Sequence, residues 1–134
     1  MSAGLATRLV TRFDDAVART RAALAQHGFG LVTEIDVRAK LQAQLGVDME
    51  DYLILGACNP ALAYRAISVD REIGLLLPCN KLVRADPGDP GTVIVEAMDP
   101  GLLDEVTGEP ALIVIADEVT ENLRAAIASL TESD

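Results

Sequence analysis

The sequence predicts one α/β (α+β) domain, in which helices pack on a mixed β-sheet of four to five strands. Segments with strand and helix periodicity alternate through the first half of the chain, a Pro- and Gly-rich hairpin loop follows, and a long stretch with helical spacing comes last. A length of 134 residues suits one domain, so residues 1–134 are treated as a single unit. Half of the residues are apolar, which argues against intrinsic disorder.

The first half of the chain contains clear helix boundaries. We expect, in order, a strand at 5–11, a helix that ends before Gly28, a strand at 29–36 and a short helix at 37–45. Thr11 is the expected N-cap of the first helix, with Asp14 in the capping-box position. Asp36 is expected to cap the second helix and Gly46 to end it.

The centre of the predicted fold is a strand–helix–strand unit. Tyr52–Cys58 is an almost continuous apolar run, as expected of a strand that is covered on both faces. Asn59-Pro60 is the clearest helix start in the chain, because Asn is a favoured N-cap and Pro suits the first helical position. A helix to about Ser68 and a fourth strand from Ile73 to Arg84 then predict a right-handed βαβ crossover with parallel strands.

The C-terminal part is expected to form a hairpin and then a long helix. The loop at 86–91 joins the fourth strand to a fifth at 92–97, so that 83–84 pair with 92–95. The string ALIVI at 111–115 has the β-branched residues of a strand. Helical spacing nevertheless continues unbroken from Leu112 to Leu130, and we therefore predict one helix from about Glu109 to Leu130.

Two similar strings, ACNP at 57–60 and PCNK at 78–81, contain both cysteines. In a parallel pair of strands, Cys58 and Cys79 would lie at similar heights along the sheet. Cys58 also precedes a helix N-terminus, where backbone amides stabilise a thiolate. The candidate binding site is Cys58, Asn59, Pro60, Pro78, Cys79 and Asn80, with Cys58 as the candidate nucleophile and the more exposed thiol.

Packing is the competing interpretation of these strings. Free cysteine is among the most buried residue types, and two cysteines do not make a disulfide framework. In this interpretation Asn59 only caps a helix, and Asn80 only satisfies backbone groups near Pro78. Exposure of Cys58 distinguishes the two interpretations.

Other candidates for chemistry are weaker. Glu34 and Asp36 share a strand face, but a helix cap plus a solvated Glu explains them. His27 ends a helix, where its charge suits the helix dipole, and no triad partner is in place. No spacing typical of a metal site is present, so no metal ligand is assigned and the cofactor is unknown.

Charge and hydropathy restrict the partners. A net charge of −10 argues against nucleic acid, which requires Lys and Arg to displace counterions. No apolar run is long enough to span a membrane or to form a signal peptide, so we expect no membrane partner and a cytoplasmic location.

The strings GF at 28–29, TEIDV at 33–37, YLILGACNPALAYRAI at 52–67, IGLLLPCN at 73–80 and DP at 99–100 resemble domain-of-unknown-function family 302. The resemblance covers about residues 13–131 and implies a small bacterial or archaeal α/β domain without an assigned activity. Cys58, Asn59, Pro60, Pro78, Cys79 and Asn80 carry it. Some members accompany redox or sulfur proteins, which favours the thiol interpretation.

Three functions remain open at this point. The first is a module that binds a small ligand, a metal or a sulfur species at the paired cysteines. The second is a thiol enzyme or sulfur carrier that uses Cys58 as nucleophile, so whether the chain is an enzyme stays open. The third is a structural or interaction domain with buried cysteines. A homodimer is also expected, because the apolar stripe Leu112–Leu130 and the run Ile73–Leu77 exceed what one small core needs.

Overall fold

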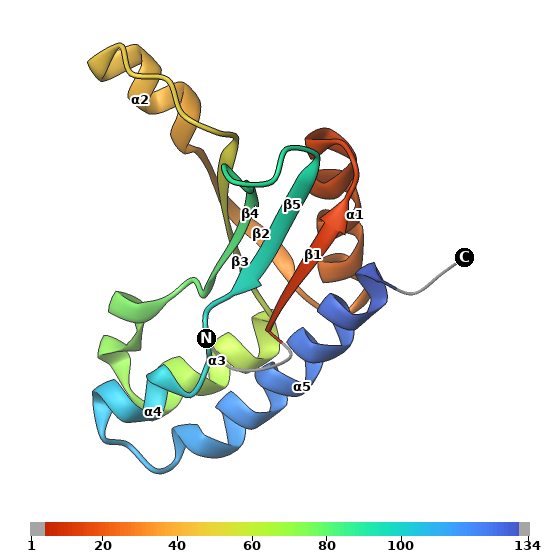
Figure 1. The fold of residues 1–134 in the computed structure, drawn as a ribbon. Helices are drawn as coiled ribbons and strands as arrows, with labels where there is room; N and C mark the ends of the chain where they lie inside the picture. Colours follow the sequence, from red (N-terminus) through yellow and green to blue (C-terminus); the bar gives the residue numbers. More distant parts are fainter. Residues whose placement is uncertain (1–4, 132–134) are drawn as a thin grey trace.

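The computed structural model describes residues 5–131 (Figure 1). Its elements are, in chain order, β1 (Ala6–Val10), α1 (Phe13–Gln26), β2 (Gly30–Asp36), α2 (Val37–Leu45), β3 (Tyr52–Cys58), α3 (Pro60–Val69), the 3₁₀ helix η1 (Arg71–Leu76), β4 (Asn80–Ala85), β5 (Thr92–Ala97), α4 (Leu102–Thr107) and α5 (Leu112–Leu130). The predicted α/β class, with five strands in one sheet and a long C-terminal helix, is confirmed.

The sheet has the strand order β1-β5-β4-β3-β2, and every neighbouring pair is antiparallel. The predicted mixed sheet with a parallel βαβ crossover is therefore wrong. β3 and β4 run in opposite directions, with Gly56 paired to Asn80 and Tyr52 to Arg84. The predicted β4–β5 hairpin is confirmed, and in it Val83 lies opposite Val95.

The fourth strand is shorter than predicted, and this explains the change of direction. Ile73 lies in η1, and β4 begins only at Asn80, after Pro78. Helix α3 carries the chain away from the end of β3, and η1 and the segment after it return the chain to the same end of the sheet (Figure 1). A strand that starts where its neighbour ends must be antiparallel to it.

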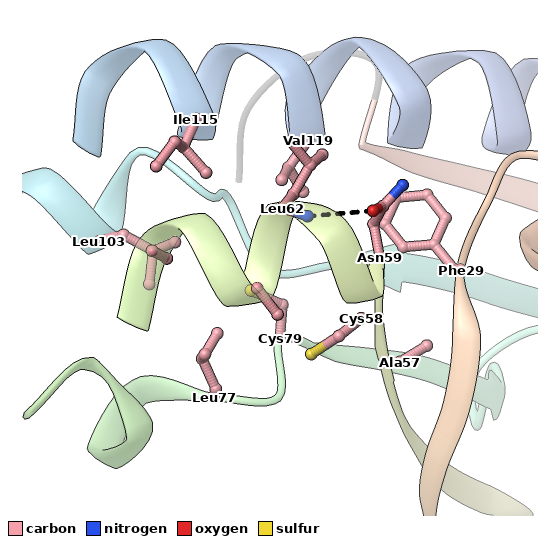
Figure 2. Close-up of a pocket in the computed structure, with 12 residues that line it drawn as sticks. Phe29, Ala57, Cys58, Asn59, Leu62, Leu77, Cys79, Leu103, Ile115 and Val119 are labelled. Atoms are coloured by element: carbon pink, nitrogen blue, oxygen red, sulfur yellow. Dashed lines mark hydrogen bonds between the residues drawn. The ribbon is translucent and has the colours of Figure 1, made fainter. Parts of the chain in front are cut away.

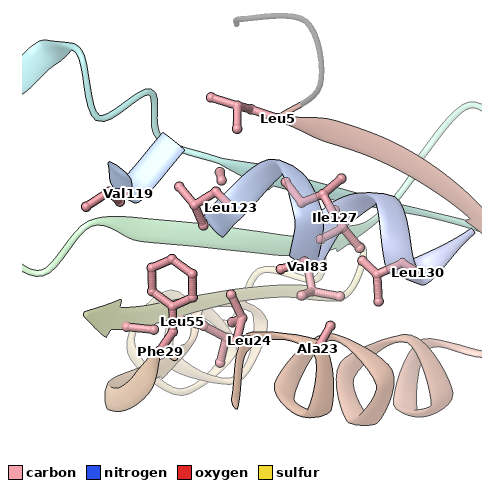
Figure 3. Close-up of a cluster of buried hydrophobic side chains, with 14 of the residues drawn as sticks. Leu5, Ala23, Leu24, Phe29, Leu55, Val83, Val119, Leu123, Ile127 and Leu130 are labelled. Carbon is pink, nitrogen blue, oxygen red and sulfur yellow. The ribbon is translucent and has the colours of Figure 1, made fainter. Parts of the chain in front are cut away.

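Helices α1 and α5 cover one face of the sheet, whereas α3 and α4 lie toward one end and α2 extends away at the other (Figure 1). The apolar positions of α5 face the sheet and α1, where Leu123 and Ile127 lie among Leu24, Leu55 and Val83 (Figure 3). The α5 stripe is thus buried within one chain. The extending helix α2 buries none of its residues.

Local capping signals are mostly confirmed. Asp36 Oδ1 accepts a hydrogen bond from the Ala39 amide at 3.0 Å, and Gly46 ends α2 in the left-handed conformation. Thr11 does not cap α1 as predicted. The N-cap is Arg12 without a side-chain bond, and the Thr11 hydroxyl instead donates to Asp15 Oδ2 at 2.7 Å.

Candidate functional site

The two cysteines lie at the same end of the sheet because β3 and β4 are antiparallel. Cys58 is the last residue of β3, and Cys79 directly precedes β4. The Ala57 amide donates to the Cys79 carbonyl at 3.4 Å, which continues the ladder past Gly56 and Asn80. The backbones at the two cysteines are therefore neighbours through an antiparallel pairing, which is opposite to the predicted parallel one. Figure 2 shows both side chains between α3 and the segment that carries Leu77.

The two thiols differ in exposure. Both are free, with Cys58 half-buried and Cys79 only 5% exposed. The predicted order of exposure is confirmed. Burial raises the pKa of the Cys79 thiol, and the nearby Lys81 acts in the opposite direction. At neutral pH Cys79 is therefore a protonated thiol, while Cys58 is the cysteine that keeps partial exposure to solvent.

Asn59 performs the capping role that its position predicts. Its Oδ1 accepts a hydrogen bond from the Leu62 amide at 3.1 Å, and Pro60 occupies the first turn of α3 (Figure 2). The Asn59 side chain also lies against Gly28, where an added Cβ would come within 3.0 Å of Nδ2. Gly28 has a φ of +89°, so close approach and backbone conformation both require glycine there.

The other two residues of the predicted site, Pro78 and Asn80, do not line the cavity that Asn59 and the cysteines line. Asn80 is exposed at the start of β4, and its carbonyl accepts from the Met98 amide at 3.0 Å. The Pro78 ring lies over Gly56, where an added Cβ would be 2.6 Å from Pro78 Cγ. Pro78 and Asn80 border a shallow groove that also contains Lys40 and Met98. They therefore do not share one pocket with Asn59.

A small cavity adjoins both thiols. Its walls are Cys58 and Cys79 together with apolar side chains from α3, α4 and α5 and the Phe29 ring (Figure 2). The volume of this cavity is about 20 Å³, which is room for about one water molecule. A cavity of this size accepts one or two heavy atoms beyond the Cys58 sulfur.

The most unusual residue of the region is Lys81, which the sequence interpretation missed. It is 2% exposed, and its Nζ donates to the carbonyl oxygens of Ala57 and Cys79, each at 2.8 Å. The Nζ atom also lies 5.1 Å from the centroid of the Phe29 ring, within the range of a cation–π contact. Burial lowers the pKa of Lys81, and the thiols of Cys79 and Cys58 act to raise it.

A sequence signal for Lys81 did exist. Residues 79, 81 and 83 alternate along one strand and share a face, and Val83 is a plain core residue. A lysine between Cys79 and Val83 is thus placed toward the core. Leu82 is also apolar and lies on the opposite face of the strand. The sequence alone therefore does not show which of the two faces is buried.

The weaker candidates are structural, as their simpler interpretation predicted. Glu34 pairs with Arg21 at the surface, and Asp36 caps α2. His27 is the C-cap of α1, with its Nδ1 2.7 Å from the Ala23 carbonyl oxygen. Within residues 5–131 no group of three or more His, Cys, Asp and Glu is placed to hold a metal ion. No helix in the described part of the chain is long and apolar enough to cross a membrane.

These observations define a class of protein: a small α/β domain with helices on one face of a five-stranded antiparallel sheet and a cavity lined by two free cysteines at its end. The family model "Domain of unknown function DUF302" matches residues 5–130, so the chain belongs to that family. None of the curated proteins matches the sequence.

A solved structure of the family has the same fold. It is described as the crystal structure of an uncharacterized conserved protein DUF302 from Bacillus stearothermophilus, and it is 28% identical to this chain. The similarity covers 92% of this chain and 96% of the other, with a TM-score of 0.80. The resemblance seen in the cysteine strings is thereby confirmed, and it brings no activity with it.

Proposed function

We propose that this chain is a small-ligand binding module that holds a sulfur species on Cys58. The observation that carries the proposal is that Cys58 is only half-buried and also lines a cavity with room for about one water molecule. The first turn of α3, with Asn59 as N-cap, directs backbone amides toward this end of β3. An added sulfur atom is of the size that the cavity accepts.

A metal ion is the less favoured ligand. Two thiols supply too few ligands for a structural zinc site, which needs four. The described residues bring no third metal ligand to the two cysteines. The positive charge of Lys81 beside the thiols also disfavours a cation.

A sulfur-loading experiment tests the proposal. The native protein is incubated with inorganic polysulfide, the excess is removed, and the mass of the intact chain is measured. We expect the added mass of one sulfur atom in the wild type and in Cys79→Ser, and none in Cys58→Ser. Equal loading of Cys58→Ser and wild type would overturn the proposal, as would a wild-type protein that takes up no sulfur.

The alternative of a thiol enzyme differs from a carrier in turnover. An enzyme that uses Cys58 as nucleophile needs a base that can cycle its proton. Lys81 is the titratable neighbour of both thiols, and its Nζ is already hydrogen-bonded to two carbonyl groups. We therefore favour stoichiometric binding. Incubation with excess polysulfide and cyanide distinguishes a carrier from an enzyme. A carrier accelerates the formation of thiocyanate little, whereas an enzyme accelerates it through many cycles.

The third alternative, a structural domain with packed cysteines, applies well to Cys79 but less well to Cys58, which keeps solvent access. A domain of this kind would leave both thiols unmodified while folded. The sulfur-loading experiment therefore also tests this alternative.

We also propose that the chain acts as a homodimer in the cytoplasm. The α5 stripe no longer supports a dimer because it is buried in the core, but Leu75 in η1 is 86% exposed, and Val32 and Leu45 are exposed as well. Free thiols suit a reducing compartment. Light scattering at tens of micromolar, roughly the range of weak to moderate interfaces, tests the dimer, and a monomer there would count against it.

A further inference from the structure

Lys81 is a buried cation without a carboxylate partner. Every ion pair among residues 5–131 uses an arginine, and Lys81 takes part in none of them. Its two hydrogen-bond acceptors are neutral carbonyl groups. A buried ammonium is costly without a compensating anion, so this position requires an explanation beyond packing.

The two hydrogen bonds place the ammonium directly beside the cysteine backbones. One acceptor belongs to Ala57, the residue before Cys58, and the other belongs to Cys79 itself. Because Lys81 extends from β4 toward β3, its Nζ joins the two strands at the end where both thiols lie. The Phe29 ring lies against the same ammonium and contributes no charge.

The other groups around Lys81 do not supply an anion. Thr20 from α1 and Glu96 from β5 line a second small cavity together with Lys81. The Thr20 hydroxyl is neutral, and the Glu96 carboxylate accepts from Arg84 Nε at 2.9 Å. The titratable groups that act on Lys81 are the thiols of Cys79 and Cys58. The thiols of Cys79 and Cys58 are therefore the neighbouring groups of Lys81, among the described residues, that can become anionic.

We propose that Lys81 is the fixed counter-charge of the site and holds a persulfide on Cys58 as its anion. The ligand class is accordingly sulfane sulfur, delivered by a persulfide or a polysulfide anion. This inference rests on the proposed function and specifies its ligand. A persulfide is a stronger acid than a thiol, so a neighbouring ammonium favours its ionised form more readily than that of an ordinary cysteine.

The loading step balances without any other reactant. Cys58 loses its thiol proton to water, and its sulfur attacks the terminal sulfur of the donor. One S–S bond forms on Cys58 and one S–S bond of the donor breaks. The electron pair of the broken bond leaves with the donor, which becomes a thiolate or a polysulfide anion one sulfur shorter. The Cys58 sulfur is oxidised from the thiol level to the persulfide level, and the donor sulfur that leaves is reduced to the same extent.

Lys40 is the matched control, since it and Lys81 are the only lysines in the chain and Lys40 lies on the extending helix α2. Lys81→Met and Lys40→Met are loaded with inorganic polysulfide, and the loss of the added mass is followed after the donor is removed. We expect Lys81→Met to lose its sulfur about tenfold faster than wild type and Lys40→Met to match wild type. Circular dichroism and the urea midpoint report whether each variant is folded.

A second measurement needs no variant. With ¹³C in the lysine side chains, the wild-type protein gives separate signals for Lys81 and Lys40. Loading Cys58 should move the titration of Lys81 to higher pH, because the new anion stabilises the ammonium, and should leave Lys40 unchanged. This measurement decides the question if Lys81→Met does not fold.

The outcomes separate the inference from the proposed function. If the wild type loads on Cys58 but the Lys81 titration does not move, Lys81 is not the counter-charge and only this inference fails. A folded Lys81→Met that keeps its sulfur as long as the wild type leads to the same conclusion. If the wild type takes up no sulfur, both proposals fail.

Discussion

The strings ACNP at 57–60 and PCNK at 78–81 share the dipeptide Cys-Asn but lie in different environments. In the first, Asn59 caps α3 and Cys58 remains half-buried beside a cavity. In the second, Asn80 opens β4 at the surface and Cys79 is buried beneath it. The difference arises from the element that each string begins, a helix in one case and a strand in the other. Similar sequence strings thus acquire different chemistry from their neighbours in the fold.

The largest expected contrast between the strings is in thiol reactivity. Cys58 should react with iodoacetamide at least about 100 times faster than Cys79, which becomes accessible only through local or global opening. Cys79→Ser leaves the fast thiol and Cys58→Ser the slow one, so single-exponential alkylation of each variant measures the ratio. Comparable rates in the two folded variants would remove the distinction between the two strings.

The packing between the strings depends on Gly56. A Cβ there would lie 2.2 Å from Thr33 Oγ1 and 2.6 Å from Pro78 Cγ, so Gly56→Ala must displace the segment that holds Cys79. We expect a loss of about 1–3 kcal/mol of stability in urea denaturation. Gly74→Ala is the control, because nothing lies within 4 Å of its added Cβ. A Gly56→Ala protein as stable as Gly74→Ala would contradict the close packing.

The pH dependence of stability separates Lys81 from Cys79. Burial lowers the folded pKa of Lys81 below its ordinary 10.5, so the unfolded state binds more protons between the two values and stability rises with pH there. Burial raises the folded pKa of Cys79 above its ordinary 9.0. The protonated thiol therefore contributes stability below pH 9.0, and this stability is lost as the pH rises through the folded pKa. A one-unit difference corresponds to about 1.4 kcal/mol.

The two substitutions should therefore change the slope in opposite directions. Urea midpoints between about pH 8 and about pH 10.5 should rise more steeply in Cys79→Ser than in the wild type, and less steeply in Lys81→Met. Lys40→Met provides the baseline. Identical slopes in the wild type and both variants would show that neither group changes its proton affinity on folding.

The smallest expected effect concerns the asparagines. Asn59→Ala removes the cap of α3 and should cost about 1 kcal/mol of stability, whereas Asn80→Ala at the exposed start of β4 should cost less than about 0.5 kcal/mol. Thermal or urea denaturation of the two variants side by side measures the difference. An Asn80→Ala variant as damaged as Asn59→Ala would mean that Asn80 has a structural role beyond opening the strand.

The sequence by itself determined the elements whose signals are local. The start of α3 at Asn59-Pro60, the end of α2 at Gly46 and the β4–β5 hairpin follow from capping and turn preferences that act within a few residues. Helix α5 belongs with these, because its helical period outweighed the β-branched string at 111–115.

Only the tertiary structure decided the direction of β4 and the surroundings of the cysteines. Strand direction depends on where the connection returns, and the fold of 71–76 as a 3₁₀ helix brought the chain back to the end of β3 that it had left. That return placed Lys81 between Ala57 and Cys79, two residues far from each other in the sequence. A buried charge is stable only where distant groups converge on it, and no local pattern contains that information.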